Sequence, residues 1–338
     1  MVVTAKESKD WAKEKLRGII TGLIPTFTRD MQSLNEKAII HDIDEIAKQG
    51  FCGFSIITET GTTPAENKQL MEICARRARG KLLTVLLSTF PTLKENLEMT
   101  AFAHEAGVDM IQLGFPSMWR PSSTEDVLQY TQNICDVAKM PVILWAAEMW
   151  GWCGLLNDAS NYPKDLLLKF SSLDNVVAIK AGTRDPGILK EIFAKGIIPG
   201  TVSEPLWPLW IRKFNAQWGG ISEYNHLYFC AEYFKSLRAG DWNRGMELYF
   251  KMAPIRDLWG RLLRAEVGGT DVDWGWTGHN RLRWKYAAWL SGLNGGPLRG
   301  SFRIAPTDMV HIRKAMLASE IPVKSETDDK FFEGRNPG

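Results

Sequence analysis

A single lysine ends a short apolar run of the chain. Residues Val176–Lys180 read Val-Val-Ala-Ile-Lys, a β-prone segment that finishes on one positive charge. Burying a lysine at the tip of a strand costs free energy unless its amine is paired or used. A partly desolvated amine can attack a ketone and form a Schiff base. We therefore predict that Lys180 is a catalytic nucleophile. The alternative is that Lys180 only marks the end of the strand and turns to solvent.

The elements around Lys180 follow a β-then-α alternation. Eight such units predict a parallel sheet with right-handed crossovers, which closes into an α/β fold of the (β/α)8 TIM barrel type with Lys180 at the catalytic mouth. A doubly wound open sheet is the alternative, but it needs a Gly-rich phosphate loop after its first strand, and Ile24–Phe27 is not one. The expected strands are Ile19–Ile24, Gly53–Ile57, Leu82–Leu87, Met110–Leu113, Val142–Trp145, Val176–Lys180, Ile197–Gly200 and Gly220–Ser222. The expected helices, from apolar spacing of three or four residues, are Asn35–Gln49, Ala65–Arg79, Leu93–Ala106, Thr124–Ala138, Lys164–Ser171, Pro186–Lys195 and Leu206–Phe214.

After the eighth strand the pattern changes to helices without strands between them. These are Tyr224–Arg238, Trp242–Ala265, Asn280–Leu290 and Pro306–Ala318, with a loop at Val267–Gly278. The first completes the barrel, and the other three form a C-terminal helical extension. We expect a barrel over 17–239, the extension over 240–322, and terminal segments at 1–16 and 323–338. The polar tail Lys324–Gly338 is expected to be disordered or draped over a neighbouring subunit.

Composition excludes several classes of protein. The 338 residues are 45% hydrophobic and 24% charged, and the formal net charge of +2 implies no general attraction to nucleic acid or membranes. Five cysteines without CxxC spacing favour reduced thiols and a cytoplasmic location. Met1–Arg17 lacks the apolar core of a signal peptide, and no apolar run is long enough to span a membrane. The five histidines show no metal-ligand spacing, and we expect no metal or cofactor.

Four segments together resemble one known family. They are Val177–Lys180, Thr58–Gly61, Gly219–Ser222, and the C-terminal pair formed by Lys285–Ala288 and Gly296–Arg299. In this order and spacing the chain is similar, from about Arg17 to Pro322, to the dihydrodipicolinate synthase / N-acetylneuraminate lyase superfamily of class I, Schiff-base aldolases. It looks like a divergent member.

The resemblance implies roles for several residues. Lys180 corresponds to the Schiff-base lysine of strand six. Thr60, with the N–H groups around Gly61, corresponds to the motif that holds the substrate carboxylate. Ser222 belongs to the strand-eight motif and is expected to bind substrate. Near strand seven, Ser203 and Glu204 align more loosely with substrate-contacting positions.

The departures from the family pattern matter equally. The strand-five tyrosine that moves protons in relatives is replaced by Trp145, whose indole N–H is no acid or base near neutral pH. The stretch Met149–Cys153 lacks the arginine of the synthases, and Ser117–Trp119 replaces a Tyr-Tyr pair, so lysine biosynthesis is not expected. A relay threonine is replaced by Glu59. We hypothesise that Glu59 takes over the acid–base work. The alternative is a plain ion pair with Lys180 or an arginine.

Tryptophans are concentrated after strands four, five and seven. The six residues are Trp119, Trp145, Trp150, Trp152, Trp207 and Trp210. In a barrel they would surround the mouth, which favours a substrate with an aromatic or apolar tail. We expect Trp119 and Trp145 to bind that tail, and the alternative places several of the six in subunit contacts. The short basic run Arg281, Arg283 and Lys285 is interpreted as a solvated helix face.

We therefore predict a carbon–carbon lyase, an aldolase or hydratase-aldolase, that forms a Schiff base with a small-molecule 2-oxo acid such as pyruvate. One alternative is a dehydratase that uses the same lysine. Another is a barrel that has lost catalysis and only binds a ligand, and a third is catalysis outside pyruvate chemistry. The resemblance also implies a homo-oligomer, either a tetramer or a dimer.

Overall fold

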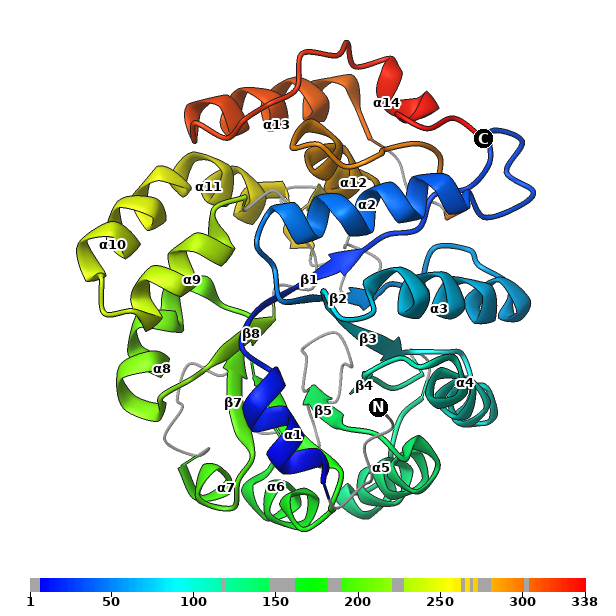
Figure 1. The fold of residues 1–338 in the computed structure, drawn as a ribbon, viewed down its shortest axis with the longest axis vertical. Coiled ribbons are helices and arrows are strands. Elements are labelled where there is room, and N and C mark those ends of the chain that lie inside the picture. Colours follow the sequence, from blue (N-terminus) through cyan, green and yellow to red (C-terminus); the bar gives the residue numbers. More distant parts are fainter. Residues whose placement is uncertain are drawn as a thin grey trace.

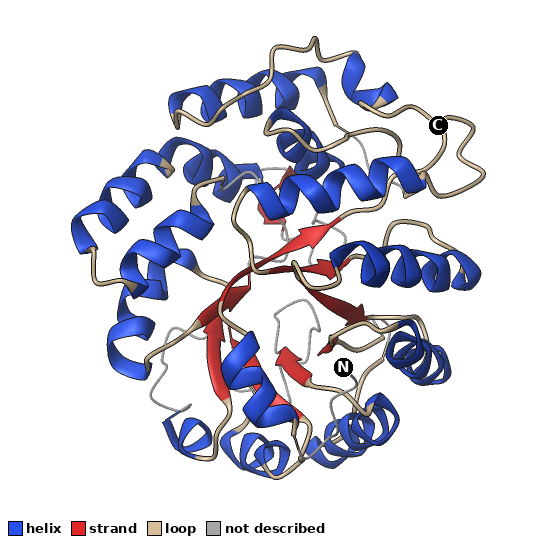
Figure 2. Cartoon of the chain, in the orientation of Figure 1, coloured by secondary structure: helices blue, strands red, loops and turns tan. Residues whose placement is uncertain are grey.

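The computed structural model describes residues 7–116, 119–145, 162–181, 190–220, 228–262, 265–267, 270–272, 281–300 and 304–338. Eight parallel strands form one sheet in the order β7-β6-β5-β4-β3-β2-β1-β8, and helices surround it (Figures 1 and 2). The strands are β1 (Gly18–Leu23), β2 (Gly53–Ile56), β3 (Leu83–Ser88), β4 (Met110–Leu113), β5 (Val142–Trp145), β6 (Val176–Ala181), β7 (Ile198–Thr201) and β8 (Trp218–Gly220). The predicted (β/α)8 barrel is confirmed. The eighth strand begins two residues earlier than expected.

The surrounding helices begin where the sequence supplies caps. The hydroxyls of Thr63, Thr92 and Ser123 each accept a hydrogen bond from a backbone N–H of the first helical turn. The carboxylate three positions later accepts one from the backbone N–H of the capping residue. The helices of this layer are α2 (Glu36–Lys48), α3 (Pro64–Ala78), α4 (Leu93–Ala106), α5 (Thr124–Ala138), α6 (Lys164–Ser171), α7 (Lys190–Ala194), α8 (Trp207–Phe214) and α9 (Cys230–Arg238).

A separate helix, α1 (Ser8–Lys15), closes the amino-terminal end of the barrel (Figure 1). Its Ala12, together with the following Leu16, belongs to the core inside the ring of strands. The side chain of Gln217 donates a hydrogen bond to the Leu16 carbonyl at 2.9 Å and fixes this plug next to β8. The sequence analysis did not predict α1. Because α1 and Leu16 fill the amino-terminal end of the barrel, a ligand would reach the interior from the carboxyl ends of the strands. TIM barrels place their active sites at that end.

The Trp218 side chain fills the space between β7 and β8, the two strands at the ends of the sheet order. A Cβ on Gly200 of β7 would lie 2.3 Å from the Trp218 ring, so only glycine fits beside the indole. The indole N–H points to the carbonyl of Ile198 at 3.5 Å. The ring thus helps to close β7 against β8.

The C-terminal extension contains α10 (Trp242–Lys251), α11 (Ala253–Leu262), α12 (Arg281–Leu290) and α13 (Pro306–Ala318). The single helix predicted over Trp242–Ala265 is wrong. Pro254 interrupts it, because proline cannot donate a backbone hydrogen bond and is tolerated only in a first helical turn, here that of α11. A short hairpin, β9 (Ala265–Val267) paired with β10 (Thr270–Val272), begins at the end of this predicted helix and continues into the predicted loop.

The tail is ordered against its own chain, so the prediction of a disordered tail is wrong, whereas contact with a neighbour stays a prediction. It contains α14 (Lys330–Glu333), and Phe331 is buried against Tyr286 and Trp289. Asn336 donates a backbone hydrogen bond to the Asn294 side chain at 2.7 Å. Among the described residues, no helix is both long and apolar enough to cross a bilayer.

Candidate active site

Lys180 lies inside the barrel near the carboxyl end of β6. Its residue is 1% exposed, and its neighbours in register are Trp145 on β5 and Gly200 on β7. A Cβ on Gly220 would lie 3.1 Å from the Lys180 Cε, so the absence of a side chain on β8 makes room for the lysine. The alternative that Lys180 turns to solvent is therefore wrong. The structure places a primary amine where barrel enzymes perform chemistry.

The Trp145 ring forms one wall beside this amine. The Lys180 Nζ lies 4.8 Å from the ring centroid. The backbone carbonyl of Trp145 accepts a hydrogen bond from the Tyr162 hydroxyl at 2.9 Å. Burial raises the pKa of Tyr162 far above that of a free tyrosine, so its hydroxyl remains a donor at neutral pH. Tyr162 was not predicted as a site residue, because the local sequence pattern does not reveal its contact with β5.

Glu59 follows β2 and faces two polar partners. Its carboxylate accepts hydrogen bonds from the Thr89 hydroxyl and from the Arg281 guanidinium, the latter at 2.6 Å. The side chains of Arg281 and Glu59 are 5% and 15% exposed. An arginine ion pair is the alternative that the sequence analysis left open for Glu59, and the structure contains it. An acid–base role for Glu59 stays a prediction.

Arg281 was missed as a site residue, and the interpretation of its basic run as a solvated face is wrong. Both Arg281 and Lys285 are buried, and Arg283 pairs with Asp308 at 2.8 Å. The Arg281 guanidinium also lies 4.4 Å from the centroid of the Trp284 ring. The extension therefore delivers a cation to the mouth of the barrel.

Lys285 anchors the same helix at the barrel mouth. Its Nζ donates to the carbonyl of Pro25, just after β1, at 2.9 Å. Burial lowers the pKa of Lys285 to about 7, while the nearby Asp42 carboxylate opposes this shift. Burial likewise raises the pKa of Asp42 to about 6, although it accepts a hydrogen bond from the Asn294 backbone. Lys285 is thus a second buried amine to distinguish from Lys180.

Thr60 and Gly61 lie next to Glu59 in the predicted carboxylate motif. Thr60 is 0% exposed, and its hydroxyl has no hydrogen-bond partner among the residues that the structure describes. A buried polar group without a partner is costly, which favours a ligand at this hydroxyl. Gly61 has a φ of 84°, and a Cβ there would lie 2.7 Å from the Cβ of Arg299. Both features require glycine at position 61.

Two further polar side chains inside the barrel were not predicted. Ser55 on β2 is in register with Val85, and Gln112 on β4 is in register with Ile143. Val85 and Ile143 belong to the inner core, so these polar side chains also face the interior. Within the described part of the chain, Ser55 Oγ and Gln112 Nε2 are buried without hydrogen-bond partners. The barrel interior therefore offers polar groups to a ligand.

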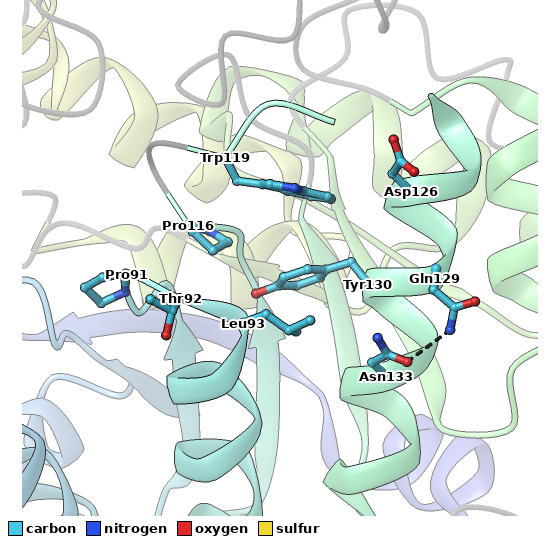
Figure 3. A pocket seen from close by; sticks show the side chains of 9 residues that line it. All are labelled: Pro91, Thr92, Leu93, Pro116, Trp119, Asp126, Gln129, Tyr130 and Asn133. Carbon is cyan, nitrogen blue, oxygen red and sulfur yellow. Dashed lines mark hydrogen bonds between the residues drawn. The ribbon is translucent and has the colours of Figure 1, made fainter. Parts of the chain in front are cut away.

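Trp119 lies in the connection between β4 and α5. Its ring stacks on Phe115 and Tyr130, with centroid distances of 5.5 Å and 4.9 Å. It lines a pocket of about 530 Å³ between the beginnings of α4 and α5 (Figure 3). The described lining residues are Pro91, Thr92, Leu93, Pro116, Trp119, Asp126, Gln129, Tyr130 and Asn133. The described lining of this pocket therefore includes Trp119 but not Lys180, Glu59 or Thr60.

The other predicted residues have three outcomes: some are buried in the helix layer, some lie near β7, and some are not described. Trp207 and Trp210 are buried in the helix layer, where Trp207 packs on Phe234 and Trp210 on Phe214, so their prediction as mouth or subunit-contact residues is wrong. Glu204 pairs with Arg256 of α11 at 2.5 Å. Ser203 is partly buried just before it. Ser222, Trp150 and Trp152 lie outside the described residues.

Comparison with known proteins identifies the family. The sequence model of the dihydrodipicolinate synthetase family matches residues 15–195, more than half of the chain. The chain belongs to the dihydrodipicolinate synthetase family. The 4-hydroxy-tetrahydrodipicolinate synthase of Methanopyrus kandleri is 21% identical over 254 residues, which cover 71% of this chain and 80% of the relative. The predicted superfamily is confirmed, and the low identity fits a divergent member.

Solved structures agree on the fold. The dihydrodipicolinate synthase from Oceanobacillus iheyensis superposes with a TM-score of 0.73 at 16% identity, covering 93% of this chain and 99% of that one. The N-acetylneuraminate lyase from Fusobacterium nucleatum gives a TM-score of 0.70 at 14% identity, covering 89% and 97%. The prediction of an enzyme of the class I aldolase type, a carbon–carbon lyase, is confirmed at the level of the dihydrodipicolinate synthetase family.

Proposed function

We propose that the protein is a Schiff-base-forming lyase, an aldolase or hydratase-aldolase, that acts on a 2-oxo acid with an aromatic or apolar tail. The observation that carries this proposal is the Lys180 amine, buried at the carboxyl end of β6 against the Trp145 ring. The polar hydroxyl of Thr60 and the polar groups inside the barrel support an oxygen-rich ligand head. The aromatic wall supports an apolar tail.

In the proposed reaction, the neutral Lys180 amine attacks the keto carbon and forms a carbinolamine. Loss of water gives an iminium. Glu59 accepts the proton of a hydroxyl on C4, two carbons from the iminium carbon C2. The C3–C4 bond then breaks, C4 leaves as an aldehyde, and the electron pair of the broken bond forms the C2–C3 double bond of an enamine while the iminium nitrogen is neutralised. Protonation of the enamine carbon and addition of water to the resulting iminium release the shortened 2-oxo acid and restore Lys180.

The neighbouring residues have proposed roles in this sequence. The Thr60 hydroxyl and the N–H groups around Gly61 hold the substrate carboxylate through charge-assisted hydrogen bonds. Glu59 moves protons at the aldehyde oxygen and the enamine carbon. Trp145 contacts the tail, and Ser222 completes the substrate site. A tail that extends past the β4–α5 connection would reach Trp119.

Reductive trapping tests the lyase. Borohydride with pyruvate should add covalent mass to the wild-type protein and none to Lys180→Met, whose side chain is similar in size but has no amine. Product analysis then separates the reactions. An aldehyde plus pyruvate supports a lyase, whereas an unsaturated or deoxy oxo acid indicates the alternative dehydratase. Binding of pyruvate without any trapped mass indicates a barrel that only binds ligands.

We also propose a homo-oligomer, a dimer or tetramer, in a reducing, cytoplasmic setting. Val310 and Leu317 lie seven residues apart on α13, hence on one face, and their residues are 58% and 56% exposed. Exposed apolar side chains grouped on a helix favour a subunit contact. The four described cysteines are free thiols. Light scattering of the wild type and of Val310→Lys/Leu317→Lys tests the subunit contact, which predicts a smaller particle for the variant.

A further inference from the structure

The C-terminal extension contributes one charged side chain directly beside the predicted carboxylate motif. Arg281 is the first residue of α12, and its guanidinium contacts Glu59 at 2.6 Å. Glu59 in turn immediately precedes Thr60. The extension therefore contacts the residue that precedes the predicted carboxylate motif.

Two contacts of the Arg281 guanidinium and one of Lys285 fix the amino-terminal part of α12. The guanidinium lies over the Trp284 ring, 4.4 Å from the centroid, and it donates to Glu59. Four residues further along the same helix, Lys285 is tied to the Pro25 carbonyl at the end of β1. Residues four apart lie on the same face of a helix, so α12 is anchored to the mouth at two successive turns. A buried, stacked arginine loses little entropy when it forms an ion pair.

Glu59 creates an electrostatic problem for the substrate proposed above. A carboxylate on the residue before Thr60 would repel a second carboxylate held by this motif, and the repulsion is strong where water is largely excluded. The Arg281 guanidinium supplies the opposite charge within hydrogen-bond distance of that carboxylate. This ion pair offsets the negative charge of Glu59 and lowers the repulsion that a second anion would meet.

We propose that Arg281 is a positioning residue that sets the charge of the substrate-carboxylate subsite. It neutralises and orients Glu59, and thereby makes the Thr60–Gly61 motif selective for an anionic head group. This inference rests on the proposed Schiff-base function. It extends that function by assigning substrate selectivity to the C-terminal extension.

The test measures how the yield of borohydride-trapped protein depends on ligand concentration. Pyruvate is the anionic probe, and methyl pyruvate is the uncharged one. In Arg281→Met, half-saturation by pyruvate should require about tenfold more ligand or higher, whereas half-saturation by methyl pyruvate should change less than about twofold. Arg281→Lys keeps the charge and should lie between the wild type and Arg281→Met.

Two further variants separate charge from structure. Glu59→Thr/Arg281→Met removes both charges and should restore half-saturation by pyruvate to within about threefold of the wild type. Arg283→Met is the matched control, because Arg283 pairs with Asp308 inside the extension and should leave both probes unchanged. If Arg281→Met does not fold, Glu59→Thr alone tests the proposed role of Arg281. It leaves the guanidinium facing the subsite and should lower the pyruvate concentration needed.

The outcomes are distinguishable. Equal effects of Arg281→Met on both probes, or no recovery in the double variant, would overturn the role of Arg281 while leaving the lyase proposal intact. An unchanged or raised pyruvate requirement in Glu59→Thr would overturn it as well. If the wild-type protein itself is not trapped by either probe, the proposed function fails, and the role of Arg281 fails with it.

Discussion

The Lys180 amine lies 4.8 Å from the centroid of the Trp145 ring, and the two residues occupy paired positions on β6 and β5. The family resemblance seen in the sequence implies a tyrosine in the place of Trp145 in relatives. The indole cannot relay a proton, but its face can hold and shield an amine in a water-poor chamber. The pairing thus places an aromatic wall beside the amine.

Trp145→Leu should lower the rate of borohydride trapping by pyruvate at least about tenfold, because the amine loses the ring that positions it. It should also cost about 1–3 kcal/mol of unfolding free energy through lost packing. Trp145→Phe keeps a ring face and should retain most of the trapping rate. Trp210→Leu is the matched control in the helix layer, and it should lose stability without slowing trapping. Equal trapping by Trp145→Leu and wild type would contradict a positioning role for the ring.

Gly220→Ala should displace the lysine side chain. A Cβ at this position would lie 3.1 Å from the Lys180 Cε and 3.3 Å from the Cδ, so the lysine must shift by a few tenths of an ångström. We expect trapping by pyruvate to slow by about tenfold with only a modest change in the free energy of unfolding. Gly219→Ala, which would instead contact Trp207 at 2.8 Å, should destabilise the fold more and leave the trapping rate of the folded protein closer to wild type.

Tyr162→Phe should weaken the end of β5. The variant removes the hydrogen bond to the Trp145 carbonyl and leaves that buried carbonyl without this donor, at a cost of about 1–3 kcal/mol. Urea unfolding measures the cost. The trapping rate should fall less than in Trp145→Leu, because the ring itself is retained. A loss of all trapping in folded Tyr162→Phe would instead assign the phenol a direct role in proton transfer.

The buried Asp42 and Lys285 pair predicts a pH profile for stability. The pKa of Asp42 is raised to about 6 from an ordinary value of 3.8, so the folded state binds more protons than the unfolded state between pH 4 and 6, and stability falls there as pH rises. The pKa of Lys285 is lowered to about 7 from 10.5, so the unfolded state binds more protons between pH 7 and 10, and stability rises with pH there.

The reference for this profile is Asp42→Asn/Lys285→Met, which has neither titrating group. Relative to it, the wild-type unfolding free energy should decrease from pH 4 to 6 and increase from pH 7 to 10, with slopes of at most about 1.4 kcal/mol per pH unit. Urea unfolding at fixed pH values measures both proteins. Parallel profiles for the two proteins would show that this pair titrates no differently in the folded and unfolded states.

Much of the barrel could be predicted because the periodicity of its elements is local. The strands Met110–Leu113 and Val142–Trp145 have the expected bounds, and so do the helices Leu93–Ala106 and Thr124–Ala138, whose caps are present in the sequence. Lys180 could be found because a lone charge after an apolar strand is conspicuous. These features depend on residues within one element.

The remaining features depend on contacts between distant residues. Arg281 and Glu59 are 222 positions apart, and no local pattern distinguishes a guanidinium aimed at the mouth from one on a solvated helix face. The ordered tail likewise depends on Phe331 inserting beside Tyr286 and Trp289, an aromatic contact that a polar composition conceals. The six tryptophans were assigned by their place after strands, whereas packing directed Trp207 and Trp210 into the helix layer.

The central claim is tested most directly by peptide mapping of the borohydride-treated protein after incubation with pyruvate. Two buried amines compete for the label, Lys180 inside the barrel and Lys285 on α12, whose pKa is lowered to about 7. We predict that the reduced pyruvate adduct is found on the peptide containing Lys180 and is absent in Lys180→Met. An adduct on Lys285 in place of Lys180, or no adduct at saturating pyruvate, would contradict the assignment.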